Sequence, residues 1–252
     1  MKQFNVEKLQ VKIMPNRTEM GKVAAEDAHR VIVQLLAEKE QINMIFAAAP
    51  SQNDVLASLA TYDDIDWTRI NAFHMDEYIG LPHGDSRTFG YYLNEHVFGK
   101  LPFRTVNLID GSAKDIDAER ARYAKLLQDN PCDIVMMGIG ENGHIAFNDP
   151  GVADFNDPEV IKVAKLDEVC RMQQVHDGCF PTINDVPTHA LTLTCPTLVG
   201  AKYQFCVVPT DKKANAVKRM LTGEIDDECP ATILRRAEHA TLYLDEPAAS
   251  LL

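Results

Sequence analysis

Two short segments of the sequence carry side chains that can move protons. In the first, residues 73–82, Asp76 directly follows an apolar stretch, and Glu77 comes next. In the second, residues 138–150, His144 stands five residues before Asp149. Burying an unpaired carboxylate is costly, so an acid at such a place has a partner, caps a turn or does chemistry. A histidine oriented by a carboxylate is a typical general acid or base, so the two segments together suggest proton-transfer chemistry.

The glycines of the second segment allow two interpretations. Residues 138–143 (GIGENG) fit the Gly-x-Gly-x-x-Gly fingerprint of dinucleotide-binding folds. However, His144 follows at once and Asn148-Asp149-Pro150 comes soon after, where the fingerprint would open a long helix. We therefore predict no nicotinamide cofactor and expect Gly140 and Gly143 to let the backbone approach a small ligand closely.

A third segment, residues 207–214, runs from an apolar stretch into a predicted helix. Lys213 lies in the first turn of that helix, where backbone N–H groups point outward and an anion is favoured. The plainer alternative is a solvated surface lysine.

These segments follow short apolar runs that alternate with helical patterns. The spacing of apolar residues predicts helices at residues 18–38, 55–59, 86–98, 115–129 and 211–222, and strands at residues 42–48, 70–74, 105–109, 132–138, 190–194, 203–208 and 240–245. The alternation predicts an α/β fold, a three-layer Rossmann-like domain with a mainly parallel sheet flanked by helices. Ligands of such sheets bind where loops leave the carboxyl ends of strands, and 252 residues fit one domain.

The bulk properties exclude several classes of partner. The formal net charge of −12 repels nucleic acid and anionic membranes. Residues 1–15 lack the apolar core of a signal peptide, and no stretch approaches the roughly 20 apolar residues that cross a bilayer. The six cysteines form no C-x-x-C pair, so we predict no metal site. These features favour a cytoplasmic protein.

Several motifs resemble those of one enzyme family. Residues 73–82 (FHMDEYIGLP), 85–93 (DSRTFGYYL), 138–150 (GIGENGHIAFNDP), 186–194 (VPTHALTLT) and 211–214 (DKKA) look like segments of the glucosamine-6-phosphate deaminases, also called glucosamine-6-phosphate isomerases. The resemblance runs from about residue 42 to residue 245, with the motifs in the family's order. It implies the fold of that family.

The resemblance also implies a reaction and roles. Members convert glucosamine 6-phosphate and water into fructose 6-phosphate and ammonia, with no metal or organic cofactor. By motif, Asp76 resembles the base that moves a proton between C2 and C1. His144, assisted by Asn142 and Asp149, resembles the ring-opening relay, and Lys213 matches the lysine that contacts the substrate phosphate. The expected partner is a small amino sugar phosphate, and homo-oligomers are common among family members.

The segments that should bind the substrate depart from the family pattern. The glycine-rich phosphate loop is replaced by residues 47–54 (AAAPSQND), where Ser51 can still donate a hydroxyl. The family has an arginine that helps to bind the substrate, but the position that aligns with it in residues 171–180 is about Val175 or His176. We expect Arg171 to substitute for it from another angle. We also count Glu77 and His176 among the substrate-binding residues.

Two further departures concern the relay and regulation. Asp149 stands where the family has glutamate, which shortens the carboxylate arm by one methylene, and a water could bridge the gap. Residues 151–155 lack the serine and basic residues of an allosteric site present in some members. We therefore predict no activation by N-acetylglucosamine 6-phosphate.

Three other functions compete with this reading. A 6-phosphogluconolactonase-like hydrolase shares the glycine-histidine segment, but such sequences tend to read DER after the second strand and GHxASLFP after the glycines. A deaminase for a different or non-phosphorylated amino sugar fits the altered phosphate loop. A non-enzymatic sugar sensor needs no proton relay, so the combination of Asp76, Asn142, His144 and Asp149 argues against it.

Overall fold

The centre of the computed structural model, which describes residues 1–252, is an eight-stranded sheet. All its strands run parallel to their neighbours except β1 at the edge, which is antiparallel to β2. In sheet order the strands are β1 (Lys2–Val6), β2 (Leu9–Met14), β11 (Ala240–Asp245), β10 (Tyr203–Val208), β7 (Ile134–Met137), β3 (Ile42–Phe46), β4 (Ile70–His74) and β6 (Thr105–Asn107). The predicted mainly parallel sheet is confirmed.

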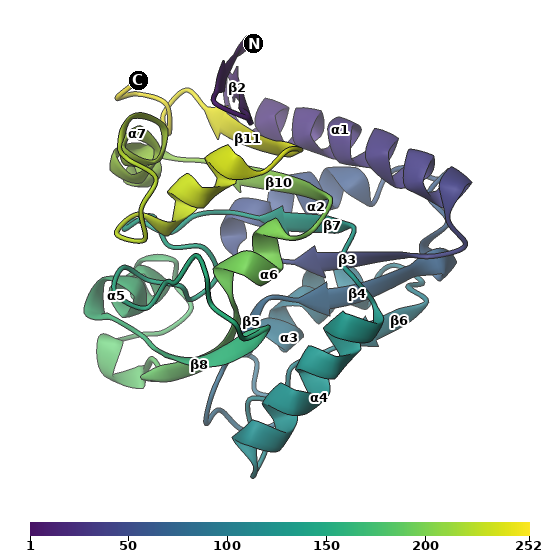
Figure 1. Ribbon diagram of the computed structural model, residues 1–252, viewed down its shortest axis with the longest axis vertical. Coiled ribbons are helices and arrows are strands. Elements are labelled where there is room, and N and C mark those ends of the chain that lie inside the picture. Colours follow the sequence, from purple (N-terminus) through teal and green to yellow (C-terminus); the bar gives the residue numbers. More distant parts are fainter.

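Helices cover both faces of this sheet. Helices α1 (Arg17–Glu38) and α2 (Asn53–Leu59) pack on one face, and α4 (Ile116–Asp129), α6 (Cys195–Val199) and α7 (Ala214–Thr222) pack on the other. In Figure 1, α6 stands in front of the sheet and the fainter α2 lies behind it. Every residue of β3, β4 and β7 is buried, as expected for strands covered on both faces. The three-layer prediction is confirmed.

A second, smaller sheet stands at the carboxyl ends of the main strands. Its order is β5 (Asp76–Tyr78), β9 (His189–Leu193) and β8 (Ile161–Lys165), and all its pairs are antiparallel. Only Met75 separates β4 from β5, so one strand of the main sheet leads directly into the small sheet. A cluster of aromatic and aliphatic side chains joins this sheet to α3 (Phe89–Leu93) and α5 (Glu168–His176).

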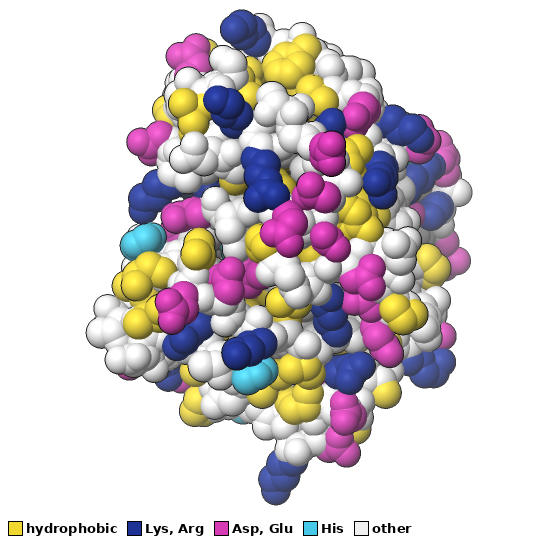
Figure 2. Space-filling view, turned by 60° about the vertical axis from the view of Figure 1, so that its left-hand side comes forward, with side chains coloured by type: hydrophobic (Ala, Val, Ile, Leu, Met, Phe, Trp, Pro, Cys, Tyr) yellow, Lys and Arg dark blue, Asp and Glu magenta, His cyan; other side chains and the backbone are white.

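Short helical turns complete the chain. They are η1 (Pro50–Gln52), η2 (Trp67–Arg69), the π-helical turn η3 (Asn94–Phe98), η4 (Ile183–Asp185), η5 (Asp211–Lys213) and η6 (Pro230–Arg236). None of the helices is both long and apolar enough to span a membrane. On the face of the molecule drawn in Figure 2, acidic and basic side chains are interspersed.

The order of the strands creates a switch point between β3 and β7. From β3 the chain proceeds outward to β4 and β6, whereas from β7 it proceeds the other way to β10 and β11. The connections leave these two strands in opposite directions, which opens a crevice at their carboxyl ends. The loops after β3, β4, β7 and β10 all reach this crevice.

Three predicted elements differ from the structure, and several elements were not predicted. The strand expected at residues 190–194 forms, but as β9 of the antiparallel sheet. The helix expected at residues 86–98 is divided into α3 and η3, and the one at residues 211–222 begins with the tighter turn η5. The hairpin of β1 and β2 was not predicted, although Leu9, Val11 and Ile13 of β2 alternate with polar residues. Strands β5 and β8 and helix α5 also lacked a clear signal.

Candidate active site

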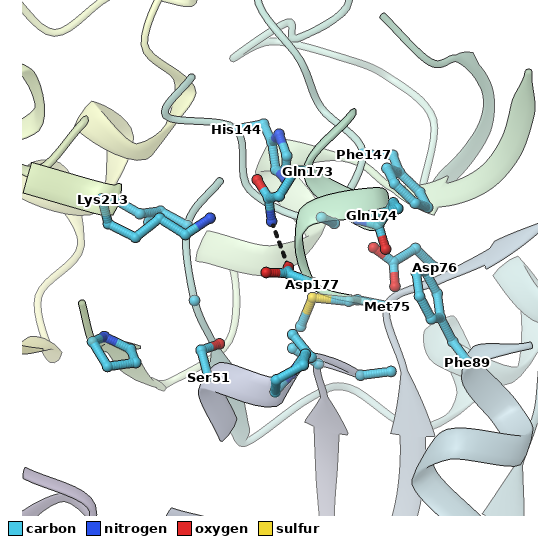
Figure 3. A pocket seen from close by; sticks show the side chains of 18 of the residues that line it. Ser51, Met75, Asp76, Phe89, His144, Phe147, Gln173, Gln174, Asp177 and Lys213 are labelled. Atoms are coloured by element: carbon cyan, nitrogen blue, oxygen red, sulfur yellow. Dashed lines mark hydrogen bonds between the residues drawn. The ribbon is translucent and has the colours of Figure 1, made fainter. Parts of the chain in front are cut away.

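A cleft lies over the switch point, and its walls come from segments far apart in the chain. Asp76 and Phe89 line it on one side, and Lys213 with Thr210 on the other, while His144 and Phe147 descend from the loop after β7. Figure 3 shows Asp76 and Lys213 on opposite sides of this space, with Ser51 below and His144 above. Asp76, His144 and Lys213 thus line one cleft, whereas Asp149 and Asn142 do not line it and lie behind His144.

Asp76 is the first residue of β5 and is 8% exposed. It pairs with Thr192 of β9, so the backbone that carries it is fixed on the small sheet. Burial, and then the charge of the neighbouring Glu77, raise the pKa of Asp76 well above its usual value. A desolvated carboxylate without a cationic partner is a stronger base than one in water, which suits it to accept a carbon-bound proton.

His144 is held by a buried acid and an amide. Its Nδ1 atom lies 2.9 Å from Oδ1 of Asp149, in a contact that is not aligned as a linear hydrogen bond. Asn142 donates its amide N–H to the same carboxylate oxygen at 3.0 Å and accepts the backbone N–H of His144 at 3.0 Å. Asp149 is fully buried. Burial alone would raise the pKa of Asp149, but the contacts with His144 and Asn142 outweigh it and lower that pKa.

The loop that carries His144 is attached to the small sheet. The backbone N–H of Phe147 donates to the Thr192 hydroxyl at 3.0 Å, and the Asn148 amide donates to the carbonyl oxygen of Leu193 at 2.8 Å. Thr192 is also the residue that pairs with Asp76. Strand β9 therefore holds both the backbone of Asp76 and the loop that carries His144.

The two glycines of this loop act on the loop itself. A Cβ atom on Gly140 would stand 2.2–2.4 Å from ring atoms of His144, so only glycine leaves room for the imidazole. Gly143 has φ +87°, and its Cβ would stand 2.6 Å from Sγ of Cys229. Neither glycine lines the cleft. We had expected them to approach the ligand, and the structure instead shows them shaping the histidine loop.

The opposite end of the cleft has a cation without a partner. Nζ of Lys213 is buried and makes no hydrogen bond. Burial lowers the pKa of Lys213, and the charges of Asp177 and Glu141 partly oppose this. Thr210, which precedes η5, has φ +77°, a strained conformation for a β-branched residue, and its N–H donates to Asp245 at 3.0 Å. Strained backbone of this kind is typical of ligand sites.

Glu77 lies outside the cleft, contrary to our expectation. Adjacent residues of a strand point to opposite faces, so Glu77 points away from the side that Asp76 faces. Its carboxylate accepts the backbone N–H groups of Tyr78, Phe89 and Gly90 at 2.9–3.1 Å, which fixes the start of α3. Burial raises the pKa of Glu77 to about 7 despite these three donors, with Asp110 adding to the rise.

Arg171 and His176 are also outside the cleft. Arg171 donates to the carbonyl oxygens of Ile183 and Val186 at 2.6 and 3.0 Å, so its guanidinium holds η4 and cannot substitute for the missing family arginine. The ring of His176 lies 3.7 Å from Glu141, and its side chain is 46% exposed. Both residues belong to α5, but neither lines the cleft.

The acid at 149 is also close to a thiol. His144, Asp149 and Cys170 each offer one ligand atom within 4.8 Å of the others. Two ligand atoms at about 2.0–2.1 Å from a tetrahedral zinc ion would stand about 3.3 Å apart. The 2.9 Å between His144 and Asp149 is that of two groups in direct contact, so this cluster fits a proton relay better than a metal site.

Comparison with known proteins places this geometry in a family. The family model described as "Glucosamine-6-phosphate isomerases/6-phosphogluconolactonase" matches residues 15–243, which is nearly the whole chain. The chain belongs to this family. A glucosamine-6-phosphate deaminase of Bacillus cereus (strain B4264) is 37% identical over 227 residues, which are 90% of this chain and 84% of that relative. Another from Bacillus thuringiensis (strain Al Hakam) is 36% identical over the same extent.

Solved structures of family members have the same fold. A monomeric glucosamine-6-phosphate deaminase superposes with a TM-score of 0.87 at 28% identity, covering 96% of this chain and 99% of its own. A 6-phosphogluconolactonase from Thermotoga maritima superposes with a TM-score of 0.75 at 19% identity, covering 93% and 98%. At that identity the second likeness concerns the fold alone.

The sequence did not reveal one wall of the cleft, which is formed by α5. Gln173, Gln174 and Asp177 all enter it from α5 and its carboxyl end. The amide oxygen of Gln173 accepts the N–H of Glu141 at 2.9 Å, and its NH₂ group donates to Asp177 at 3.4 Å, the contact drawn dashed in Figure 3. The sequence offered no signal for this wall, because α5 itself was not predicted.

Proposed function

We propose that this protein is an amino-sugar-phosphate deaminase/isomerase that converts glucosamine 6-phosphate, or a close analogue, and water into a ketose phosphate and ammonia. The observation that carries the proposal is one cleft containing a desolvated, unpaired carboxylate, Asp76, and a histidine backed by a buried acid, His144. Relatives named glucosamine-6-phosphate deaminase support it, as does membership of the family.

The first step opens the sugar ring. The C2 proton becomes acidic only beside a carbonyl carbon at C1, which the closed ring lacks. His144 exchanges a proton with the ring oxygen, while Asp149 and Asn142 hold its ring and its backbone in place. A buried ionised acid behind the histidine stabilises the imidazolium that forms when the ring accepts a proton.

The second step moves a proton between neighbouring carbons. Asp76 removes the proton from C2 to give an enolamine and returns it to C1, which leaves an imine at C2. Water then adds to C2 and ammonia leaves. No net charge is created on the protein, because the same carboxylate accepts and donates the proton. Lys213 and Ser51 contact the end of the substrate far from Asp76.

Ammonia release from a panel of amino sugars and their 6-phosphates tests this function. We expect ammonia and the corresponding ketose from at least one of them. The rival is a lactonase, because one solved neighbour is a 6-phosphogluconolactonase, so 6-phosphogluconolactone is assayed in parallel. Hydrolysis of the lactone with no ammonia from any amino sugar would reverse the assignment.

We propose further that residues 1–252 work as one domain in the cytoplasm on small molecules. Strand β4 of the main sheet leads directly into β5 of the small sheet, and this continuity favours a single domain. Self-association is expected from the family, whereas one solved neighbour is described as monomeric. Light scattering of the purified protein decides between these states.

A further inference from the structure

Helix α5 and its carboxyl end present three polar side chains to the cleft. Gln173, Gln174 and Asp177 all line it, and because Asp177 follows the two glutamines by four and three residues, they share one face of the helix. In Figure 3 the Gln174 amide and the Asp177 carboxylate lie between Asp76 and Lys213. This face of α5 therefore borders the middle of the cleft.

Gln174 carries an amide that the protein itself does not use. The residue is 8% exposed, and its side chain makes no hydrogen bond, whereas buried amides normally have partners. By contrast, the side chain of Gln173 accepts the N–H of Glu141 and donates to Asp177. The Gln174 amide offers two N–H donors and an oxygen acceptor to a ligand in the cleft.

Asp177 also has acceptor capacity to spare. Its carboxylate accepts one side-chain hydrogen bond, the 3.4 Å contact from Gln173, and its charge acts on the Lys213 ammonium without forming a salt bridge. The dipole of α5 is unfavourable for an acid at this end, so Asp177 does not stabilise its own helix. The free lone pairs of a carboxylate suit hydroxyl groups, which donate short, strong hydrogen bonds to them.

The two ends of the cleft fix where the middle of the substrate lies. The end opposite Asp76 has free donors that suit a phosphate group. They are the Lys213 ammonium, the Thr210 hydroxyl and the backbone N–H groups of Ala48, Ala49 and Ser51. At the other end, Asp76 must reach C1 and C2 of the sugar. A sugar 6-phosphate that spans the two ends therefore places C3 and C4 beside α5.

We propose that Asp177 and Gln174 bind the sugar hydroxyls at C4 and C3, and that these contacts make the deaminase selective for the configuration of its substrate. The inference rests on the proposed function and names the residues that choose the sugar. Asp177, on the side of Lys213, takes the C4 hydroxyl, and Gln174, on the side of Asp76, takes the C3 hydroxyl.

Both contacts persist through the reaction. Ring opening breaks the bond between C1 and the ring oxygen but leaves the hydroxyls at C3 and C4 unchanged. The open chain has more rotatable bonds than the ring, so contacts at these carbons keep C2 within reach of Asp76. A hydroxyl that is missing or points elsewhere leaves the Gln174 amide or the Asp177 carboxylate without its partner, which lowers the affinity.

The test removes each hydroxyl and each side chain in turn. It measures kcat/KM for ammonia release from glucosamine 6-phosphate and from its 3-deoxy and 4-deoxy analogues. With the wild-type protein, we expect the 4-deoxy analogue to be worse by about 10–100-fold and the 3-deoxy analogue by about 2–10-fold. Asp177→Ala should abolish the 4-deoxy penalty alone, and Gln174→Met the 3-deoxy penalty alone.

A matched control separates this effect from a general loss of stability. Asp129→Ala removes an exposed acid from the carboxyl end of the outer helix α4, and both penalties should remain. A wild-type protein without either penalty overturns the inference and leaves the deaminase function standing. Penalties that persist in Asp177→Ala and Gln174→Met overturn the roles of these residues. If no amino sugar releases ammonia, the proposed function itself fails.

A binding measurement tests the C4 contact without the reaction. Glucose 6-phosphate and galactose 6-phosphate differ only in the configuration at C4 and have no amino group to release. We expect calorimetry to give dissociation constants that differ by about 10-fold or more for the wild-type protein and by less than about 3-fold for Asp177→Ala. Equal dissociation constants for the wild-type protein would overturn the inference whatever the fate of the deaminase function.

Discussion

The two ends of the cleft are built differently. At the end that includes Asp76 and His144, the His144 side chain is held by Asn142 and Asp149, and the backbones of Asp76 and of the histidine loop are attached to the small sheet. At the other end, Lys213 has no hydrogen-bond partner. The first end is set for its chemistry before the substrate arrives, whereas the second end is completed by the substrate.

The difference indicates which part of the function each end determines. Proton transfer requires groups fixed within hydrogen-bond reach of the reacting atoms, so the linked end determines the reaction. An uncompensated buried charge costs stability and is retained where a ligand uses it, so the open end determines which sugar binds. Changes at the first end should lower kcat, and changes at the second should act mainly on KM.

We expect the largest effect from His144→Gln, at the end of the cleft that includes Asp76 and His144. Glutamine can still hydrogen-bond there but cannot exchange a proton at neutral pH, so kcat should fall by about 10²–10⁴-fold with little change in KM. Steady-state ammonia release measures both values. A rise in KM with kcat unchanged would show that His144 binds the substrate and does not act on the ring.

We expect the second-largest effect from Gly140→Ala, a substitution at a residue that does not line the cleft. The new methyl group would overlap the His144 ring, so the imidazole must move, and a displacement of about 1 Å can cost about 10²-fold in rate. Gly90→Ala is the matched control, because Gly90 does not line the cleft and its methyl group would stand 3.4 Å or more from the nearest atoms, an ordinary contact. Equal activity in the two variants would mean that the position of the His144 ring does not matter.

At the open end, Lys213→Met should separate binding from stability. Removing the ammonium loses a substrate contact, so KM should rise by about 10-fold while kcat changes little. Burial lowers the pKa of Lys213, so removing the charge should stabilise the free protein, by about 1 kcal/mol or about 2–4 °C in Tm. Thermal unfolding without substrate measures this. A lower Tm would show that Lys213 is satisfied in the free protein.

The smallest effect is a shift in the pH profile. Asp76 must be ionised to accept the C2 proton, and its pKa is raised, so kcat/KM should fall with decreasing pH at values above the ordinary aspartate pKa of about 3.9. Glu77→Gln removes a neighbouring charge, so the acid limb should move to lower pH by less than about one unit. A limb at the ordinary position would contradict the desolvation of Asp76.

How much the sequence could predict differs between the loops that follow the main strands and the wall formed by α5. Asp76, His144 and Lys213 were found because each follows an apolar strand of a parallel sheet, and such strands deliver their loops to one edge. Glu77 was wrongly assigned to the cleft. Its neighbour Asp76 faces the cleft, and because side chains alternate along β5, Glu77 points away from it.

The wall formed by α5 could not be predicted in the same way. Gln173 and Asp177 reach the cleft because α5 packs on the small sheet, and β5 and β8 of that sheet are short or partly exposed and carry a weak periodic signal. Arg171 looked like the better candidate from its charge, but the rotation of the helix directs it to η4. Such rotations are set by tertiary packing, not by local spacing.

The central claim is that Asp76 is the base that moves the proton between C2 and C1. Its most direct test follows a substrate with deuterium at C2 and measures ammonia release and label at C1 of the ketose, for the wild-type protein and for Asp76→Asn. We predict label at C1 with the wild-type protein and a loss of about 10²–10⁴-fold in turnover for Asp76→Asn, with a Tm no lower than that of the wild-type protein as evidence of folding. Undiminished turnover and label transfer in Asp76→Asn would contradict the account.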